Sequence, residues 1–351
     1  MGSDALSIPG EDVGSGEMRS VMKPRQGVAL IFGVTGQDGA YLAELLIKRG
    51  VEVHGTSRDK DASSCANLHR LGVYDHITLH SVVLSDFRSV VSALNSVKPT
   101  YIYNLAAQSS VGLSFEQPVD TIDSIMHGTI NVLEAMRFLS LDAKLYNASS
   151  SECFGETTKD RAADESTTFR PRSPYALAKA ASFWAVSNYR EAYGLFACSG
   201  LLFNHESPIR PARYVTQKIV RGAMAVAAGR SRSLTLGMLS LSRDWGWAPE
   251  YVNAMARMLE LEAPEDFVIA TGETNTLEEF VRATFDCFGL DWRAHVVTDE
   301  SLYRPIDITY SSGNPSKAEQ RLGWKAQNKM REVIGLLVDA ERKRWARESA
   351  A

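Results

Sequence analysis

Short apolar runs alternate with longer amphipathic stretches through the first half of the chain. The runs that we expect to form buried strands lie at 28–32, 51–55, 77–83, 101–107 and 145–148. Helical periodicity falls between them, at 41–48, 87–96 and 130–136. Strands that alternate with helices at this spacing are typical of a parallel sheet covered by helices on both faces. The pattern therefore predicts an α/β fold with a doubly wound parallel sheet.

A glycine-rich turn joins the first predicted strand to the first predicted helix. It carries the pattern Gly33-x-x-Gly36-x-x-Gly39. In a dinucleotide-binding turn, one glycine permits a tight turn, one lets the backbone approach a pyrophosphate, and one lets the helix pack on the strand. The phosphates then lie on free amides at the helix N-terminus. An ordinary glycine-rich turn is the alternative, because this motif alone is weak.

Composition narrows the class of protein. The 351 residues are 44% hydrophobic and 23% charged, which is ordinary for a globular protein with a sizeable core. The net charge of −4 is too mild for a nucleic-acid or membrane-surface binder. No apolar stretch approaches the roughly 18 residues needed to span a bilayer, and no secretory signal is visible. We expect a cytoplasmic protein with no nucleic-acid or membrane partner.

The four cysteines give no sign of a metal site or a disulfide framework, because they are widely spaced and have no companion histidine cluster. Residues 1–26 are expected to form a flexible tail. Residues 27–201 are expected to form mainly a Rossmann domain that binds NADP. Residues 202–351 are expected to form mainly a smaller, discontinuous C-terminal domain that binds a sugar nucleotide, with segments that return to the Rossmann domain.

The residues after the second predicted strand bear on the choice of cofactor. Arg58 and Asp59 stand where the adenosine ribose of a dinucleotide would lie. An arginine there favours the 2′-phosphate of NADP, and an acidic residue favours the free 2′-hydroxyl of NAD. Arg58 therefore points to NADP and Asp59 to NAD, while a solvated surface pair is the alternative for both.

Candidate catalytic residues follow the fifth predicted strand. Ser150 and Glu152 lie in a serine-rich loop at its end, where parallel sheets place ligands and chemistry. Tyr175 and Lys179 are four residues apart, so they share one helix face. An ammonium near the phenol is expected to lower the pKa of Tyr175, which makes it an acid/base for a sugar hydroxyl. A solvated helix face is the alternative, because Tyr-x-x-x-Lys alone is weak.

The glycine turn, the serine loop and Tyr-x-x-x-Lys together resemble the extended short-chain dehydrogenase/reductase superfamily. Longer motifs are similar, more narrowly, to the GDP-mannose 4,6-dehydratase family. These motifs occupy 33–42, 103–109, 171–175, 188–194, 202–208, 243–246, 270–272, 303–305, 313–317 and 322–324. The resemblance runs from about residue 28 to the C-terminus.

The resemblance implies a reaction that converts GDP-mannose to GDP-4-keto-6-deoxymannose. Tyr175 would act as the base on the C4 hydroxyl while a bound nicotinamide takes hydride from C4. Glu152 would remove the C5 proton and then, with Ser150, assist the loss of water from C6. Hydride would return to C6, so no cofactor is consumed. A surface glutamate is the alternative for Glu152.

The resemblance also implies binding residues and partners. The implied cofactor contacts are Gly33, Thr35, Gly36, Gln37, Asp38, Gly39, Arg58, Leu84, Leu105, Ala106, Ala107, Tyr175, Lys179 and His205. The implied substrate contacts are Ser109, Asn204, Lys218, Arg243 and Arg304. The alternatives are a turn asparagine for Asn204, a solvated lysine for Lys218 and a loop-holding role for His205. A GDP-sugar substrate and a homodimer or homotetramer are expected.

Some positions depart from the family pattern. Leu84 follows Val83 where the family has an Asp-Leu pair on the adenine, and Asp59 replaces a second arginine. The segment 237–242 is less polar than usual, and Ile209 and Pro211 replace arginine and glycine. A related sugar-nucleotide dehydratase, epimerase or reductase with another sugar is therefore an alternative. A non-catalytic nucleotide sensor is an alternative from another class.

Overall fold

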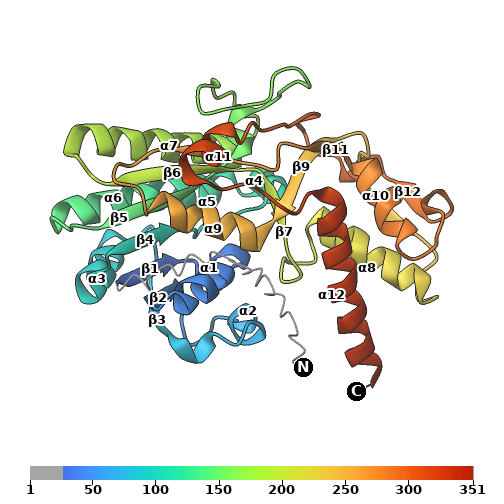
Figure 1. The fold of residues 1–351 in the computed structure, drawn as a ribbon, viewed down its shortest axis with the longest axis horizontal. Coiled ribbons are helices and arrows are strands. Elements are labelled where there is room, and N and C mark those ends of the chain that lie inside the picture. The colour runs from blue at the N-terminus through green and yellow to red at the C-terminus, as the bar shows by residue number, and fades with distance from the viewer. Residues whose placement is uncertain (1–26, 351) are drawn as a thin grey trace, which may run out of the picture.

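A parallel sheet forms the centre of the molecule. The computed structural model describes residues 27–350, so the tail expected at 1–26 lies outside the described residues (Figure 1). Within that range, the largest sheet has seven strands in the order β10-β6-β5-β4-β1-β2-β3, all parallel. The strands are β1 (Val28–Phe32), β2 (Glu52–Ser57), β3 (Ile77–Ser81), β4 (Tyr101–Asn104), β5 (Lys144–Ser150), β6 (Ala197–Leu202) and β10 (Phe267–Ile269). The predicted doubly wound fold is confirmed.

The observed strands differ from the apolar runs at their ends. β4 ends at Asn104, three residues before the predicted end, because the chain leaves the sheet there, and Leu105 and Ala107 line a cavity. β5 is longer than predicted and continues through Ser150, which places that hydroxyl at the sheet edge. The strands β6 and β10 extend the sheet beyond the five that the runs predicted.

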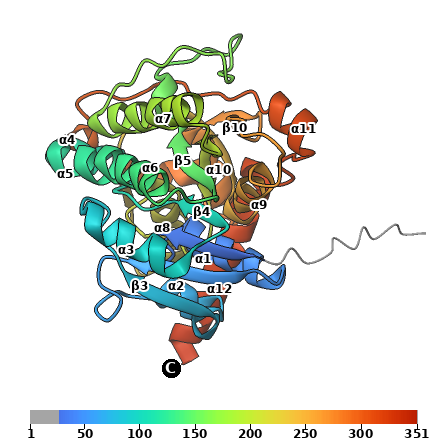
Figure 2. The same cartoon turned by 90° about the vertical axis from the view of Figure 1, so that its left-hand side faces the viewer.

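Helices cover both faces of the sheet. The α-helices of the described residues are α1 (Gln37–Lys48), α2 (Ala66–Arg70), α3 (Phe87–Val97), α4 (Val111–Glu116), α5 (Pro118–Ile122), α6 (Gly128–Phe138), α7 (Pro174–Tyr193), α8 (Val215–Ala227), α9 (Ala248–Met258), α10 (Leu277–Asp286), α11 (Ser316–Leu322) and α12 (Met330–Ala350). Helices α3, α6 and α7 pack over one face, and α1 and α9 over the other (Figures 1 and 2).

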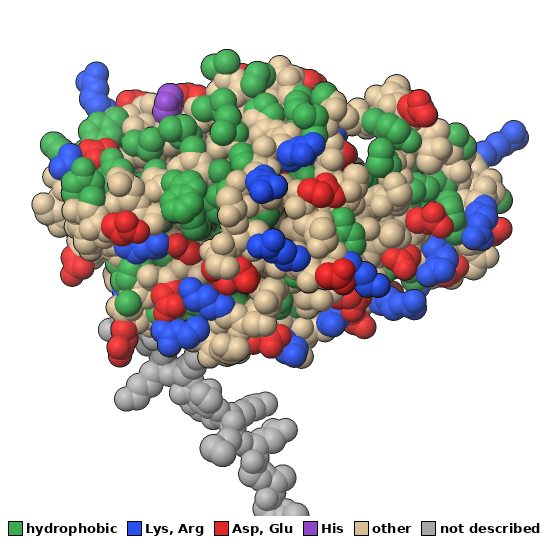
Figure 3. Space-filling view, turned by 90° about the horizontal axis from the view of Figure 1, so that it is seen from above, with side chains coloured by type: hydrophobic (Ala, Val, Ile, Leu, Met, Phe, Trp, Pro, Cys, Tyr) green, Lys and Arg blue, Asp and Glu red, His purple; other side chains and the backbone are tan. Residues whose placement is uncertain are grey.

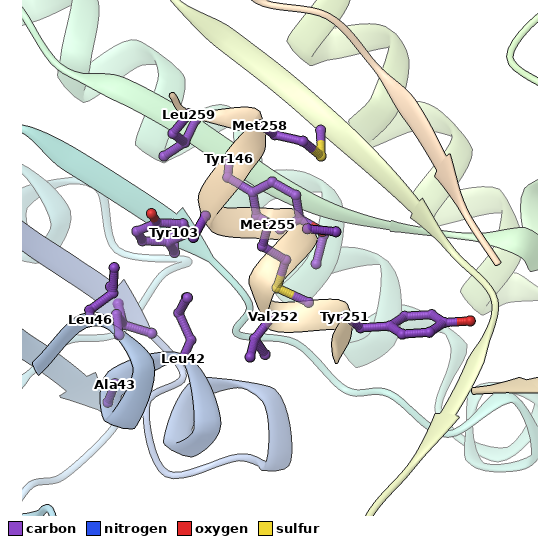
Figure 4. Packing of buried hydrophobic residues seen from close by; sticks show 14 of the residues in the cluster. Leu42, Ala43, Leu46, Tyr103, Tyr146, Tyr251, Val252, Met255, Met258 and Leu259 are labelled. Carbon is purple, nitrogen blue, oxygen red and sulfur yellow. The ribbon is translucent and has the colours of Figure 1, made fainter. Parts of the chain in front are cut away.

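The packing of α1 on α9 joins the two halves of the sequence. Leu42 and Leu46 of α1 face Val252 and Met255 of α9, and all four side chains are buried (Figure 4). Burying one such side chain contributes about 1.5–3 kcal/mol. The apolar stripe of α9 therefore holds a late segment firmly against the first helix.

A smaller group of elements lies beside the carboxyl ends of the sheet strands. It contains β7 (Asn204–Glu206), β9 (Ser242–Trp247) and β11 (Thr274–Thr276) in one sheet, and β8 (Leu234–Leu236) with β12 (Val296–Thr298) in another. Helices α8, α10 and α12 share one apolar core with them. Strand β10 returns to the large sheet beside β6. The division between 201 and 202 stays a prediction.

The helices and the surface charges bear on membrane and nucleic-acid binding. Among the helices of residues 27–350, none is long and apolar enough to cross a membrane. On the face drawn in Figure 3, acidic and basic side chains are interspersed.

Asp244 ties β9 to the loop that follows β10. Its buried carboxylate accepts hydrogen bonds from the amides of Thr271 (3.0 and 3.1 Å) and Gly272 (2.9 Å). Burial raises the pKa of Asp244 to about 7, although these amide hydrogen bonds oppose the shift.

We expect Asp244→Ala to lower the free energy of unfolding by about 3 kcal/mol, because it leaves buried amides without an acceptor. Urea unfolding followed by circular dichroism measures the loss. Asp286→Ala is the matched control: Asp286 is an exposed acid at the end of α10, and its removal should change stability by less than about 0.5 kcal/mol. Equal stability of the two variants would contradict this role of Asp244.

Candidate active site

One cavity of about 620 Å³ lies at the carboxyl ends of β1, β4 and β5 and reaches the smaller group of elements. In a doubly wound sheet this edge is where ligands bind. The predicted site residues that line it are Gly36, Gln37, Asp38, Leu105, Ala107, Ser109, Ser150, Glu152, Tyr175, Lys179, Asn204, His205, Arg243 and Arg304. Gly33, Thr35, Gly39, Arg58, Leu84, Ala106 and Lys218 do not line it.

The three glycines of the turn differ in what a side chain would meet at each position. Gly33 has φ +84°, and a Cβ there would lie 2.9 Å from the backbone of Ala106. A Cβ on Gly39 would collide with the Gly33 carbonyl oxygen, where α1 packs on the turn. At Gly36 a Cβ would meet one atom within 4 Å, the Gly33 carbonyl oxygen at 3.3 Å, and this glycine faces the cavity. The turn thus exposes backbone to a ligand at Gly36.

A polar network joins this turn to β7. His205 bonds Asp38 through Nε2 (2.9 Å) and the Phe203 carbonyl through Nδ1 (2.7 Å). The Gln37 side-chain amide donates to Asp38 (3.0 Å) and to the His205 carbonyl (3.2 Å). Burial alone would lower the pKa of His205 and raise that of Asp38, but their mutual attraction and hydrogen bond reverse both shifts. This pair holds the turn against β7.

Tyr175 lies in the first turn of α7, which Ser173 caps by accepting from the Ala176 amide (3.1 Å). The Lys179 ammonium lies 5.8 Å from the Tyr175 ring centroid and donates to the Ala148 carbonyl (2.7 Å). Burial lowers the pKa of Lys179 to about 8.

The expected lowering of the Tyr175 pKa is wrong for this structure. Burial of the phenol raises its pKa, and the Ser150 hydroxyl, which hydrogen-bonds the phenol oxygen, opposes that shift only in part. The ammonium of Lys179 is engaged by a backbone carbonyl, so desolvation outweighs it.

Glu152 lies in the short 3-10 turn Ser151–Phe154 that follows β5. The Ser150 hydroxyl accepts a hydrogen bond from the Glu152 amide (3.2 Å), which fixes the start of this turn. Glu152 is half-buried and lines the cavity. Burial raises its pKa, the charges of Arg243 and Arg304 oppose the shift, and Asp307 adds to it. A carboxyl with a raised pKa can both accept and return a proton near neutral pH.

Three of the predicted binding residues that do not line the cavity have side chains placed elsewhere. Arg58 is exposed beyond the end of β2. Leu84 packs against Gly128, and its carbonyl accepts from Asn131 (2.7 Å). Lys218 is partly buried on α8. The structure therefore does not bring these three side chains to the cavity wall.

Several cavity residues were missed by the sequence interpretation. Arg210, Arg213 and Tyr214 line it, and the Tyr214 hydroxyl bonds Ser109 (2.7 Å). The Arg210 guanidinium lies 4.0 Å from the Tyr214 ring centroid and donates to the His205 carbonyl (2.6 Å). The sequence did show two arginines, Arg210 and Arg213, soon after Pro208, but periodicity could not predict that they face the cavity. Among residues 27–350, no cluster of three or more His, Cys, Asp or Glu could hold a metal ion.

A doubly wound parallel sheet, a GxxGxxG turn and a Ser–Tyr–Lys group at the strand ends define an extended short-chain dehydrogenase/reductase. A family model described as GDP-mannose 4,6 dehydratase matches residues 30–336. The chain belongs to the GDP-mannose 4,6-dehydratase family.

Individual relatives agree with this assignment. The chain is 43% identical over 331 residues to GDP-mannose 4,6 dehydratase 1 of Arabidopsis thaliana, covering 92% of this chain and 91% of that protein. It is 41% identical over 353 residues to the GDP-mannose 4,6 dehydratase of Homo sapiens, covering 93% and 94%. A solved UDP-glucose 4-epimerase of Thermus thermophilus, in complex with NAD, has the same fold. Its TM-score is 0.79 at 28% identity, over 90% of this chain and 99% of that one.

Proposed function

We propose that the protein is a GDP-mannose 4,6-dehydratase, a lyase that converts GDP-mannose to GDP-4-keto-6-deoxymannose with a bound nicotinamide dinucleotide. The observation that carries this proposal is the presence of Glu152 beside Ser150 and Tyr175 in one cavity. A simple reductase needs the tyrosine and serine but has no use for a carboxyl at that place. Membership of the family supports the same reaction.

The residues present fit a dinucleotide. Gly36 offers backbone to a pyrophosphate at the start of α1, whose amides favour negative charge. The Ser57 hydroxyl, at the end of β2, is buried without a hydrogen-bond partner among the described residues. It could therefore donate a hydrogen bond to a ribose oxygen. The dinucleotide would supply a hydride acceptor for C4, a donor for C6 and a cationic ring.

In this mechanism Tyr175 takes the proton of the C4 hydroxyl. Ser150 hydrogen-bonds the phenol oxygen and would share it with the sugar hydroxyl. Lys179 fixes the end of β5 through the Ala148 carbonyl and keeps positive charge below the phenol. These contacts lower the free energy of the phenolate, which burial raises.

Glu152 performs the elimination. Once C4 is a ketone, the C5 proton is acidic, and the Glu152 carboxylate can remove it. The same group, now a carboxylic acid, returns a proton to the C6 hydroxyl as it leaves as water. The raised pKa of Glu152 suits both roles, since the protonated form persists long enough to act as an acid.

The substrate pyrophosphate would lie on Arg243 and Arg304. Both residues line the cavity, and a guanidinium gives forked contacts to phosphate. Asn204 and Ser109 line the same cavity and would contact the sugar. Lys218 is a weaker candidate, because it does not line the cavity.

The purified protein should convert GDP-mannose to the 4-keto-6-deoxy product with no net change in nicotinamide absorbance, as followed by mass spectrometry. Net consumption of a reduced nicotinamide with a keto-sugar would support a reductase instead. A nucleotide sensor would bind GDP-mannose and release it unchanged.

NADP is the proposed cofactor, on the position of Arg58 just after β2. We expect Arg58→Ala to weaken NADP binding about 10-fold or more, because it removes the cation beside the 2′-phosphate, and to leave NAD binding nearly unchanged. Calorimetry on protein stripped of nucleotide measures both. Arg232→Ala, at another exposed arginine, serves as the control. An equal loss for both cofactors would contradict this role.

A cytoplasmic location and a homodimeric or homotetrameric assembly belong to the same proposal. They rest on resemblance to the family, and sedimentation of the purified protein tests the assembly.

A further inference from the structure

Two arginines of the cavity share one carboxylate. Arg243 of β9 and Arg304 each place a guanidinium nitrogen 3.2 Å from the same oxygen of Asp307. Arg243 and Asp307 are largely buried, with side chains 9% and 15% exposed, so their pairing is shielded from water. Arg243 also donates to the Ser242 carbonyl (2.9 Å), which limits its freedom to turn.

Glu152 is the other anion that these arginines face. Both guanidinium charges act on the Glu152 carboxyl and lower its pKa against the effect of burial. Yet among the described residues neither arginine forms an ion pair with Glu152, although each forms one with Asp307. Glu152 and the two arginines thus line one cavity, but the arginines are held by a different carboxylate.

We propose that Asp307 is a positioning residue that holds Arg243 and Arg304 on itself and so prevents them from pairing with Glu152. This inference rests on the proposed function, because it matters only if Glu152 exchanges protons with a substrate. Asp307 itself touches no reacting atom. A substrate pyrophosphate can then bind the two arginines while Glu152 stays outside their ion pairs.

The physical reason lies in the competition between two anions. An arginine paired with a carboxylate lowers the pKa of that carboxyl by about 1–3 units. If the arginines paired with Glu152, its carboxylate would be too weak a base for the C5 proton and its acid form too rare. Asp307 supplies the competing negative charge, and it also raises the pKa of Glu152 directly.

The segment that carries Asp307 is fixed in place. Glu156, four residues after Glu152, accepts hydrogen bonds from the amides of Thr309 (2.9 Å) and Tyr310 (2.8 Å). The turn that carries Glu152 and the segment that carries Asp307 are thus tied together. The titratable groups coupled to Glu152 are Arg243 from β9, Arg304 and Asp307 from this segment, Tyr175 from α7 and the neighbouring Cys153.

Infrared titration of the cofactor-loaded protein tests the proposal without substrate. The band of the protonated Glu152 carboxyl is assigned by its loss in Glu152→Gln. In Asp307→Asn, which keeps the shape and removes the charge, the midpoint of this band should fall by about 1 pH unit or more. Asp307→Ser removes the same charge and reports the same midpoint if the asparagine variant does not fold. An unchanged or raised midpoint would overturn the proposal.

Kinetics give a second readout. Asp307→Asn should lower kcat about 10–100-fold at neutral pH while single-turnover oxidation at C4 persists, because the C5 proton transfer is affected. Asp307→Glu should restore most of the rate. The matched control Glu300→Gln, at an exposed acid nearby, should change neither the midpoint nor the rate. Equal losses in C4 oxidation and elimination would indicate a merely structural residue and overturn the proposal.

The two failures can be told apart. If the wild-type protein does not convert GDP-mannose, the proposed function fails, and the infrared midpoint still decides whether Asp307 holds the arginines from Glu152. If the wild-type protein is active but Asp307→Asn leaves the midpoint and the rate unchanged, only the inference about Asp307 fails.

Discussion

Tyr175→Phe should reduce kcat about 10²–10⁴-fold by removing the group that takes the C4 proton. The change removes the phenol oxygen and its hydrogen bond with Ser150, but it keeps the ring, whose centroid lies 5.8 Å from the Lys179 ammonium. Rapid mixing with GDP-mannose should show no transient nicotinamide reduction. Mass spectrometry should show no 4-keto product.

Tyr189→Phe is the matched control for this prediction. It removes a phenol from the same helix, where the hydroxyl donates to Glu134 (2.5 Å) outside the cavity. Its activity should stay within about 2-fold of wild type, as is usual for substitutions away from the site. If Tyr175→Phe kept wild-type activity, Tyr175 would not be the base that takes the C4 hydroxyl proton.

Glu152→Gln should separate the two halves of the reaction. Oxidation at C4 should survive, because the amide leaves Tyr175 and Ser150 in place. Elimination should fall about 10²–10⁴-fold, since glutamine can neither take the C5 proton nor return one to the leaving hydroxyl. The expected result is a nicotinamide that becomes reduced on mixing and stays reduced, with little 4-keto-6-deoxy product.

Wild-type protein and an exposed-acid variant serve as controls for Glu152→Gln. The wild-type protein should show brief reduction followed by recovery, and Glu300→Gln should match it, because that exposed acid lies outside the cavity. A complete loss of nicotinamide reduction in Glu152→Gln would mean that the carboxyl acts at C4 or supports substrate binding. Normal product formation would remove it from the chemistry.

The pKa shifts of the site separate the two acid/base groups. Burial raises the pKa of both Tyr175 and Glu152, but only the carboxyl starts from a value below neutrality. Glu152 therefore moves toward the working pH while Tyr175 moves away from it. In the proposed mechanism Tyr175 would therefore need help from Ser150, from Lys179 and from the cofactor to act as a base, whereas Glu152 would not.

Features encoded within a few neighbouring residues could be predicted. The glycine spacing predicted the turn and its close backbone approaches, because a Cβ at Gly33 or Gly39 meets backbone in the structure. Tyr175 and Lys179 were predicted on one helix face, because i and i+4 always share one. Ser150 and Glu152 were expected at a strand end, and the structure brings them to one cavity with the other two.

Strand ends and electrostatics were predicted less well. The run 101–107 continues with apolar residues after Asn104, where the chain leaves the sheet, so the predicted strand was too long. The pKa of Tyr175 was expected to fall, but burial and the engagement of Lys179 by the Ala148 carbonyl raise it. Both depend on what surrounds the residue, which spacing does not reveal.

By itself the sequence determined the doubly wound sheet and the dinucleotide turn, because periodicity and short spacings act over one or two turns of chain. It also named the candidate acid/base groups, Tyr175 through its spacing to Lys179 and Glu152 through resemblance to the family. Only the tertiary structure decided how those groups are charged and held. It placed Asp38 on His205 and Asp307 between Arg243 and Arg304, and it left Arg58 and Lys218 outside the cavity. These arrangements join segments far apart in sequence, and the burial that sets their electrostatics exists only once the chain has folded.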